Sequence, residues 1–230
     1  TGGSFALNLG GAAFATDRVF TVAGASSFGN GGGDLSLTTP LAGTGSLAFV
    51  GAGTTALASD STFAGTVSVA NGGLIITAES ALGAELTVAT PAALTLTANG
   101  GLRTAVDLSL SANRGIALDR DSGGAFTPAT GKTLTVAGVI AATTGSGSGL
   151  TGGNLTHSGS GTLVLAGANT FAGAVNVTAD GATLVVQNVA ALGTGAAVNA
   201  VAGSTLRFDV AGAPLTLAKT LTVGAAAGKV

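Results

Sequence analysis

His157 is the only histidine among the 230 residues, so a Ser/His/Asp triad would have to use its ring as the general base. The adjacent Ser158 cannot reach that ring in the geometry that base catalysis requires. The surrounding segment 145–161 is rich in Gly and Ser, a composition typical of loops. We therefore expect His157 to be an exposed loop residue without a catalytic role.

One cluster of charged residues, Asp119-Arg120-Asp121, contains the paired carboxylates that glycoside hydrolysis uses. Sugar-cleaving β-helical enzymes carry such acids together with Arg or Lys on one outer face. A similar pair, Asp17-Arg18, occurs earlier in the chain. A pair that recurs at a strand end is better interpreted as solvated charge at a corner, so we expect no catalytic residue here.

The segment Asn30-Gly-Gly-Gly-Asp34 is similar to the Gly/Asp nonapeptides that bind calcium. In that kind of site, adjacent coils share each ion, so several tandem copies are needed. The chain has one copy, no cysteine and a single histidine. We therefore expect this segment to be a turn, and we expect no metal site and no cofactor.

Three Thr-Leu-Thr segments could form an array that binds ice: Thr95–Thr97, Thr133–Thr135 and Thr220–Thr222. Such an array needs a threonine pair on each successive coil, at nearly constant spacing. The first two segments are 38 residues apart and the last two are 87 apart. The irregular spacing favours ordinary filling of strands by β-branched residues.

The composition excludes several classes of protein. Only 8% of the residues are charged, and eight Lys and Arg spread over the chain form no basic patch for nucleic acid. The uncharged run 133–179 is long, but Gly, Ser, Thr and Asn interrupt it throughout, so it predicts no membrane-spanning helix. The lack of cysteine fits an extracellular setting.

The elements that must position these residues are short strands. Apolar residues alternate with Ser, Thr, Asn or Ala, for example in Val67-Ser-Val69, Leu94-Thr-Leu96 and Leu163-Val-Leu165. This period of two places one face of each strand in a core and the other in water. Breaks such as Asn71-Gly72-Gly73 supply the positive φ of sharp corners. No window has a helical period, so the chain is predicted to be all-β.

The chain contains two similar series of segments. The later series consists of Gly161–Gly167, Asn169–Gly173, Val175–Val177, Gly181–Val186 and Ala191–Gly193. The earlier series consists of Gly45–Gly51, Ser61–Gly65, Val67–Val69, Gly72–Ile76 and Ala81–Gly83, with eight extra residues between Gly51 and Phe63. The residues expected to maintain the repeat are Gly161, Leu163, Leu165, Gly167, Asn169, Phe171 and Gly173, together with Leu47, Phe63 and Gly65. These series predict two modules, 1–110 and a continuous 111–230.

Short strands with one dry face, glycine corners and no helices are typical of a parallel β-solenoid. Coils of roughly 20–30 residues, stacked at about 4.8 Å, would give ~8–11 coils. Each coil covers the previous one, so flanking repeats of the same chain are the expected partners. Uncapped end coils would expose pairing edges, which also predicts end-to-end contact between identical chains.

The segment Gly159-Ser-Gly-Thr-Leu-Val-Leu-Ala-Gly-Ala-Asn-Thr-Phe-Ala-Gly173 resembles the passenger-associated β-strand repeat of autotransporters. The stretch 43–76 resembles it more loosely, with Ser61 in the place of Asn169. The resemblance implies a secreted bacterial surface protein with a right-handed parallel β-helical passenger. Adhesion, autoaggregation and biofilm formation are the functions that it implies, and the repeat contributes no catalytic residues.

The leading hypothesis is a non-enzymatic stalk or passenger segment, exposed on the cell surface, whose surface ligand the sequence does not specify. A subunit of a self-assembling extracellular filament or sheath is the first alternative. A β-helical polysaccharide-active enzyme is the second, and the scarcity of charged residues argues against it.

Overall fold

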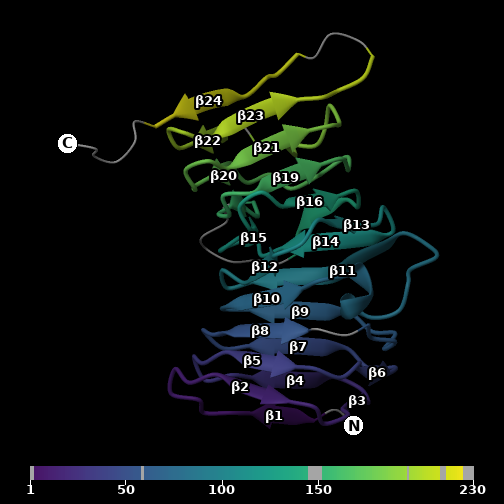
Figure 1. The fold of residues 1–230 in the computed structure, drawn as a ribbon. Coiled ribbons are helices and arrows are strands. Elements are labelled where there is room, and N and C mark those ends of the chain that lie inside the picture. Colours follow the sequence, from purple (N-terminus) through teal and green to yellow (C-terminus); the bar gives the residue numbers. More distant parts are fainter. Residues whose placement is uncertain (1–2, 58–59, 145–151, 196, 213–215, 225–230) are drawn as a thin grey trace.

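The computed structural model describes residues 3–57, 60–144, 152–195, 197–212 and 216–224. In these residues the chain forms 24 short strands and one 3-10 helix, η1 (Glu79–Leu82), which is far too short to cross a membrane. Every pairing between named strands is parallel, and the strands stack from β1 to β24 along one axis (Figure 1). The predicted all-β parallel solenoid is confirmed.

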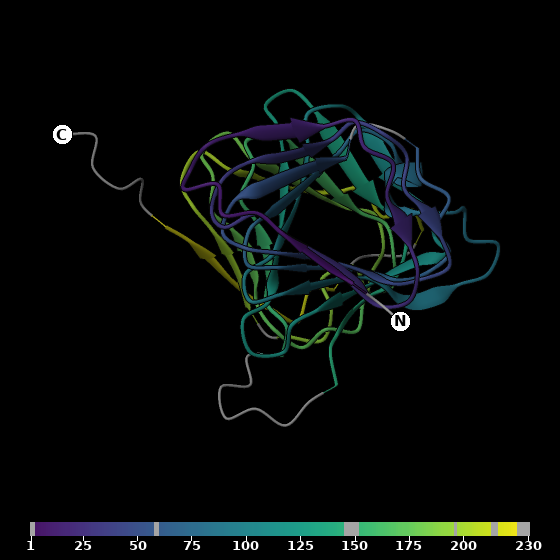
Figure 2. The same cartoon turned by 90° about the horizontal axis from the view of Figure 1, so that it is seen from below.

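Three sides enclose the axis of the solenoid (Figure 2). The first side is a seven-stranded sheet of β1 (Ser4–Ala6), β4 (Ser26–Gly29), β7 (Leu47–Val50), β9 (Val67–Ala70), β11 (Thr90–Thr97), β14 (Arg114–Leu118) and β17 (Ile140–Ala142). The second side is a ten-stranded sheet of β2 (Phe14–Thr16), β5 (Leu35–Leu37), β8 (Thr54–Leu57), β10 (Gly73–Ile76), β12 (Gly101–Thr104), β15 (Gly124–Pro128), β18 (Leu155–His157), β20 (Val175–Val177), β22 (Ala197–Ala200) and β24 (Thr220–Val223).

The third side changes its character along the axis. It begins with β3 (Thr21–Val22) and β6 (Ala42–Gly43), continues through residues 61–64 and η1, and ends in a five-stranded sheet. That sheet consists of β13 (Leu108–Leu110), β16 (Thr133–Val136), β19 (Thr162–Leu165), β21 (Thr183–Val186) and β23 (Thr205–Phe208). The first side also loses its regular strands after β17, where residues 169–171 continue the stack.

Coil length varies because the corners differ in length. On the second side, the register partners Thr55 and Leu74 of successive coils are 19 residues apart in the sequence, whereas the partners Phe126 and His157 are 31 apart. The ten strands of this side give nine steps from coil to coil, within the predicted range. The first and second sides both run across residue 110, so the two predicted modules share continuous sheets, and their division at 110 stays a prediction.

The core is a set of apolar ladders inside the coils. The alternation in each strand sends every second residue inward, and parallel register stacks equivalent residues on one another. On the third side, for example, Leu134, Leu163, Leu184 and Leu206 are successive register partners, and the first three are fully buried. Near the N-terminal end, four phenylalanines pack together: Phe5, Phe20, Phe28 and Phe49, with ring centroids 5.0–6.1 Å apart in consecutive contacts.

Candidate functional site

His157 lies in the core, so the expectation of an exposed loop residue is wrong. It is the last residue of β18, its side chain is 0% exposed, and its partners in register are Phe126 and Val177. The glycine-rich context concealed a strand, although the alternation in Leu155-Thr156-His157 indicated it. Of the predicted loop, residues 145–151 lie outside the described part of the chain.

The geometry around His157 does not form a catalytic triad. Both ring nitrogens are buried, and neither has a hydrogen-bond partner in the described residues. Ser158 is exposed on the other face of the strand, where its hydroxyl lies 2.9 Å from the Thr127 hydroxyl. Burial lowers the pKa of His157 from 6.5 to about 4, because the charged ring would lose its hydration. The ring is therefore neutral at pH 7 and separated from solvent.

The Asp119 cluster forms a turn between the first and second sides. The Asp119 carboxylate accepts hydrogen bonds from the Asp121 and Ser122 amides and from the Ser122 hydroxyl. Although burial by itself raises the pKa of Asp119, the bonds from Ser122 and Asp121 lower it below its usual value. Asp17 lies at a different corner, between β2 on the second side and β3 on the third.

The Asn30–Asp34 segment is a turn held to the next coil. The Asn30 side-chain oxygen accepts from the Gly53 amide at 3.3 Å, and Asp34 accepts from the Thr54 amide at 3.0 Å. The described residues contain no group of three or more His, Cys, Asp or Glu side chains that could hold a metal ion. Both side chains therefore act as struts between coils.

The three Thr-Leu-Thr segments face three different directions. Thr95 belongs to β11 on the first side, Thr133 to β16 on the third and Thr220 to β24 on the second. They form no common array. The register instead aligns a row of threonines on the third side: Thr133, Thr162, Thr183 and Thr205. The shared Thr-Leu start of these strands is the sequence signal that could have revealed this row.

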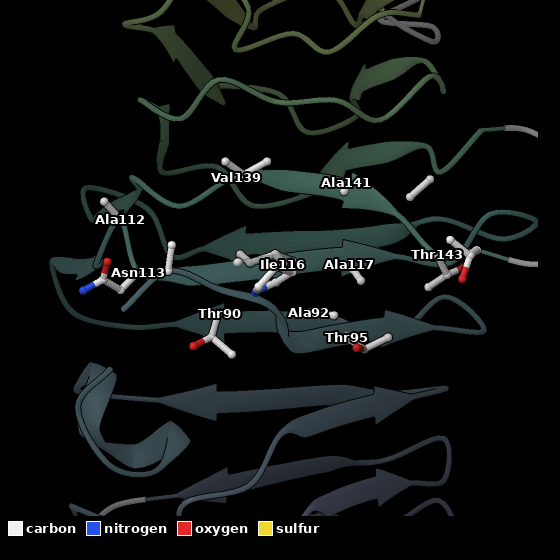
Figure 3. A pocket seen from close by; sticks show the side chains of 15 residues that line it. Thr90, Ala92, Thr95, Ala112, Asn113, Ile116, Ala117, Val139, Ala141 and Thr143 are labelled. Atoms are coloured by element: carbon white, nitrogen blue, oxygen red, sulfur yellow. The ribbon is translucent and has the colours of Figure 1, made fainter. Parts of the chain in front are cut away.

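A groove of about 490 Å³ lies on the outer face of the first side (Figure 3). Its floor is formed by the small outward side chains of β11, β14 and β17, which are register partners: Thr95, Ala117 and Ala141. Its lining comprises residues 89–92, Thr95, 112–113, 115–117, Val139 and 141–144. Val139 at the rim is 44% exposed.

A bulge in β11 builds one wall of this groove. Thr90 pairs with Arg114 and Leu94 with Ile116, so four residues of β11 span two of β14. Within the bulge, Ala92 has φ +53°, a left-handed conformation that costs free energy for a residue with a Cβ. The bulge crosses over Gly115, where a Cβ would lie 2.7 Å from the Thr90 carbonyl oxygen. Glycine at 115 is therefore required for the wall to form.

The groove has no means of acid–base chemistry. None of its lining residues carries a titratable side chain. Its polar groups are threonine hydroxyls and the Asn113 amide, whose nitrogen already donates to the Leu86 carbonyl at 2.7 Å. Such a surface can contact an uncharged partner, but it offers no proton donor, base or metal ligand.

A second hollow, of about 560 Å³, lies on the outer face of the second side near the N-terminal end. It is lined by Phe14, Ile75, Asp34 and Arg103, among others. Asp34 is bonded to the Thr54 amide, and the Arg103 guanidinium lies across Gly73, so the two charges do not form an ion pair. The hollow therefore holds charges of both signs, without the paired carboxylates that glycoside hydrolysis needs.

The segment Asn169–Gly173 connects successive coils on the first side. The buried Asn169 side chain accepts from the Ile140 amide at 2.8 Å and donates to the Ala191 carbonyl at 2.6 Å. Phe171 is fully buried in the coil interior. Gly161 and Gly173 lie directly against the backbone of the preceding coil. A Cβ on Gly161 would lie 2.2 Å from a backbone atom of that coil, and a Cβ on Gly173 would lie 2.6 Å from one. The side chains of this segment thus bind the chain to itself.

A buried ion pair, which sequence reasoning missed, joins η1 to the next coils. Arg114 Nε donates to Glu79 Oε1 at 2.8 Å, and the Arg114 side chain is only 3% exposed. The other Glu79 oxygen accepts from the Ser111 amide, and the guanidinium also donates to the Leu82 carbonyl. The two partners are 35 residues apart, so only the coil register could have revealed the pair.

Comparison with protein families finds the same repeat in two places. The family described as passenger-associated-transport-repeat matches residues 50–76 and 155–186, so these two regions, about a quarter of the chain, are similar to that repeat. The searches of curated proteins and of solved structures found no match.

The matched regions favour another alignment of the earlier copy. Leu47 lies outside the match, and β8 precedes Phe63 as β19 precedes Phe171. Gly53 and Gly161 each stand ten residues before their phenylalanine, so the eight-residue insertion is not needed. In that alignment the buried Thr55 takes the place of Leu163. The correspondence of Leu47 with Leu163 rests on the apolar pattern that Gly45–Gly51 and Gly161–Gly167 share, and it stays a prediction.

The two copies also occupy different sides of the solenoid. In the earlier copy, β8 lies on the second side and Phe63 on the third. In the later copy, β19 lies on the third side and Phe171 on the first. The copies are therefore offset by one side, so equivalent strands of the two copies lie in different sheets.

Proposed function

We propose that this chain is a non-enzymatic structural segment of a secreted bacterial passenger, which holds other parts of its protein away from the cell. The observation that carries the proposal is that two passenger repeats lie within a single continuous stack of coils. Nine steps at about 4.8 Å give a rod of ~43 Å. Its apolar ladders and hydrogen bonds between coils would make it stiff.

The charge-free groove on the first side supports a role in contact rather than catalysis. Adhesion or biofilm formation would then depend on surfaces carried by the rod. A filament subunit is the second candidate, favoured by the end strand β24, in which Leu221 and Val223 are 50% and 76% exposed. Nothing in either hollow favours a polysaccharide-active enzyme.

Surface display tests the proposal. A short epitope would be inserted at Thr130-Gly131, an exposed turn where Gly131 has open space around it. The natural protein carrying the epitope should bind antibody on intact cells of its own host, with a tagged cytosolic protein as the control for lysis. Labelling that requires permeabilised cells would contradict the proposal.

The spacer role needs a separate measurement. The segment would be replaced by a flexible Gly/Ser linker of equal residue number, whose end-to-end distance fluctuates instead of being fixed. We expect surface display to persist while attachment of cells to surfaces, or to one another, falls. Unchanged attachment would contradict the spacer role.

A further inference from the structure

The imidazole of His157 is enclosed by hydrocarbon. Its register partners on the second side, Phe126 and Val177, are 0% and 2% exposed. The following strand β19 contributes Leu163 and Leu165, which are fully buried. Neither ring nitrogen has a hydrogen-bond donor or acceptor as a partner among the described residues. A protonated ring would therefore carry a positive charge and two unsatisfied N–H donors.

The neighbouring elements offer no counter-charge for such a ring. The strands packed around it, β15, β19 and β20, contain no titratable side chain. Arg114 on β14 is the charged residue of the adjacent sheet, and its guanidinium is bound to Glu79. The remaining charged residues near these strands lie in connecting turns: Asp119, Arg120, Asp121, Lys132 and Asp180. Neither ring nitrogen of His157 is hydrogen-bonded to any of the described residues, these charged side chains included.

We propose that His157 makes the solenoid acid-sensitive, because protonation of its ring opens the coil that contains β18. The neutral ring is tolerated in the core, at the cost of two unpaired nitrogens. A proton taken up from water at one ring nitrogen creates a buried cation that only water can solvate. Water reaches the ring when β18 separates from its neighbours. The Thr178 amide, which donates to the His157 carbonyl at 2.9 Å, would then exchange with solvent.

The direction of the pH dependence follows from the two pKa values of the ring. Burial lowers the folded-state pKa from 6.5 to about 4, so the unfolded chain binds the proton more tightly. Stability is therefore complete above pH 6.5, decreases as the pH falls toward 4 and levels off below it. In that window the equilibrium constant for unfolding rises about tenfold for each pH unit by which the pH falls. At pH 5 it is ~30-fold larger than at pH 8.

The test compares the 230-residue wild-type chain with His157→Leu and His157→Gln. Leucine fills inward positions of neighbouring strands, and glutamine keeps a polar group that does not titrate near neutral pH. Denaturant unfolding of each protein would be measured at pH 8 and at pH 5. The carboxylates are the same in all three proteins, so their contribution to the change in stability cancels when the proteins are compared. Between pH 8 and pH 5, we expect the folding equilibrium constant of wild type to fall by a factor ~30-fold larger than that of either variant.

Hydrogen exchange separates local opening from global unfolding. At pH 5, corrected for the intrinsic pH dependence of exchange, the Thr178 amide of wild type should lose protection relative to the variants. An identical pH dependence in all three proteins would overturn the proposal. If leucine prevents folding, the glutamine variant decides alone. A folded-state titration of the His157 ring near pH 6.5 would overturn the proposal equally.

Discussion

Asn169 links three successive coils through one side chain. Its oxygen binds the Ile140 amide of the preceding coil and its nitrogen binds the Ala191 carbonyl of the following one. Ser61, at the same place in the earlier copy, accepts only from the Leu41 amide. The later copy is therefore held by one more bond at this corner than the earlier copy. Asparagine at this position of the repeat acts as a strut.

Replacing Asn169 by Ala should lower the free energy of unfolding by about 2–6 kcal/mol, because two buried backbone groups lose their partners at about 1–3 kcal/mol each. Ser61→Ala leaves one group unpaired and should cost about half as much. Urea unfolding at pH 8 measures both values. Equal losses for the two variants would contradict the strut role of the Asn169 amide.

Leu163 is buried in the third-side ladder, as the alternation of its strand predicts. Leu163→Asp should cost several kcal/mol and unfold at least the later coils, because an unpaired carboxylate would enter the core. The matched control is Thr162→Asp, whose side chain points outward from the same strand. Circular dichroism melting compares the two. A Leu163→Asp variant that melts like its control would show that the strand faces the other way.

At the scale of elements, the third side depends on a junction between η1 and β13. Glu79 of η1 accepts from the Ser111 amide just after β13 and pairs with Arg114 at the start of β14 on the first side. The guanidinium is buried, while the carboxylate is partly exposed. A buried pair stabilises a structure only while both partners remain, since either charge alone is poorly solvated. The pair and the Ser111 bond therefore hold η1 to the corner between β13 on the third side and β14 on the first.

Glu79→Ala should lower the free energy of unfolding by about 3 kcal/mol, because the Arg114 charge stays buried without its carboxylate. Asp209→Ala is the control. It removes the exposed Arg207–Asp209 pair, which should be worth less than about 1 kcal/mol. Denaturation at low and high salt checks both. A Glu79 variant no less stable than the Asp209 variant would refute the account of this junction.

The alternation of single strands was enough to predict the class of fold, because a half-buried strand needs a period of two. It was not enough to place His157, since the glycines and serines around β18 conceal a strand of three residues. Apolar alternation is alike on every strand, so by itself it does not decide whether Leu47 or Thr55 corresponds to Leu163. The groove and the Glu79–Arg114 pair depend on register, which one sequence does not contain.

At the scale of the whole molecule, each coil is stabilised by the coil that covers it. β24 pairs only with β22 among the described strands, and all four of its residues are exposed. At the other end, β2 pairs only with β5, and Phe14 is 40% exposed. Both of these strands lie on the second side, so one chain could stack on the next with this side aligned.

The 230-residue chain should therefore associate end to end as its concentration increases. Val223→Lys places a charge on the exposed edge and should reduce the association, since edge charges oppose strand pairing. Thr130→Lys, in an exposed turn away from the edge, adds the same charge as a control. Light scattering and analytical ultracentrifugation measure the effect. A wild-type chain that stays monomeric at high concentration would contradict the prediction.

Crosslinking across the coils tests the central claim, the stacked parallel register, most directly. The chain has no cysteine, so a pair can be introduced without competition. Asn176 and Asn199 are register partners on β20 and β22, and their side chains are hydrogen-bonded at 2.8 Å. Asn176→Cys with Asn199→Cys should form an intramolecular disulfide under mild oxidation. Asn176→Cys with Thr222→Cys spans two coils, about 9.6 Å, and should form none because a disulfide needs Cα atoms within about 7 Å. A bond in the second pair and none in the first would contradict the solenoid described here.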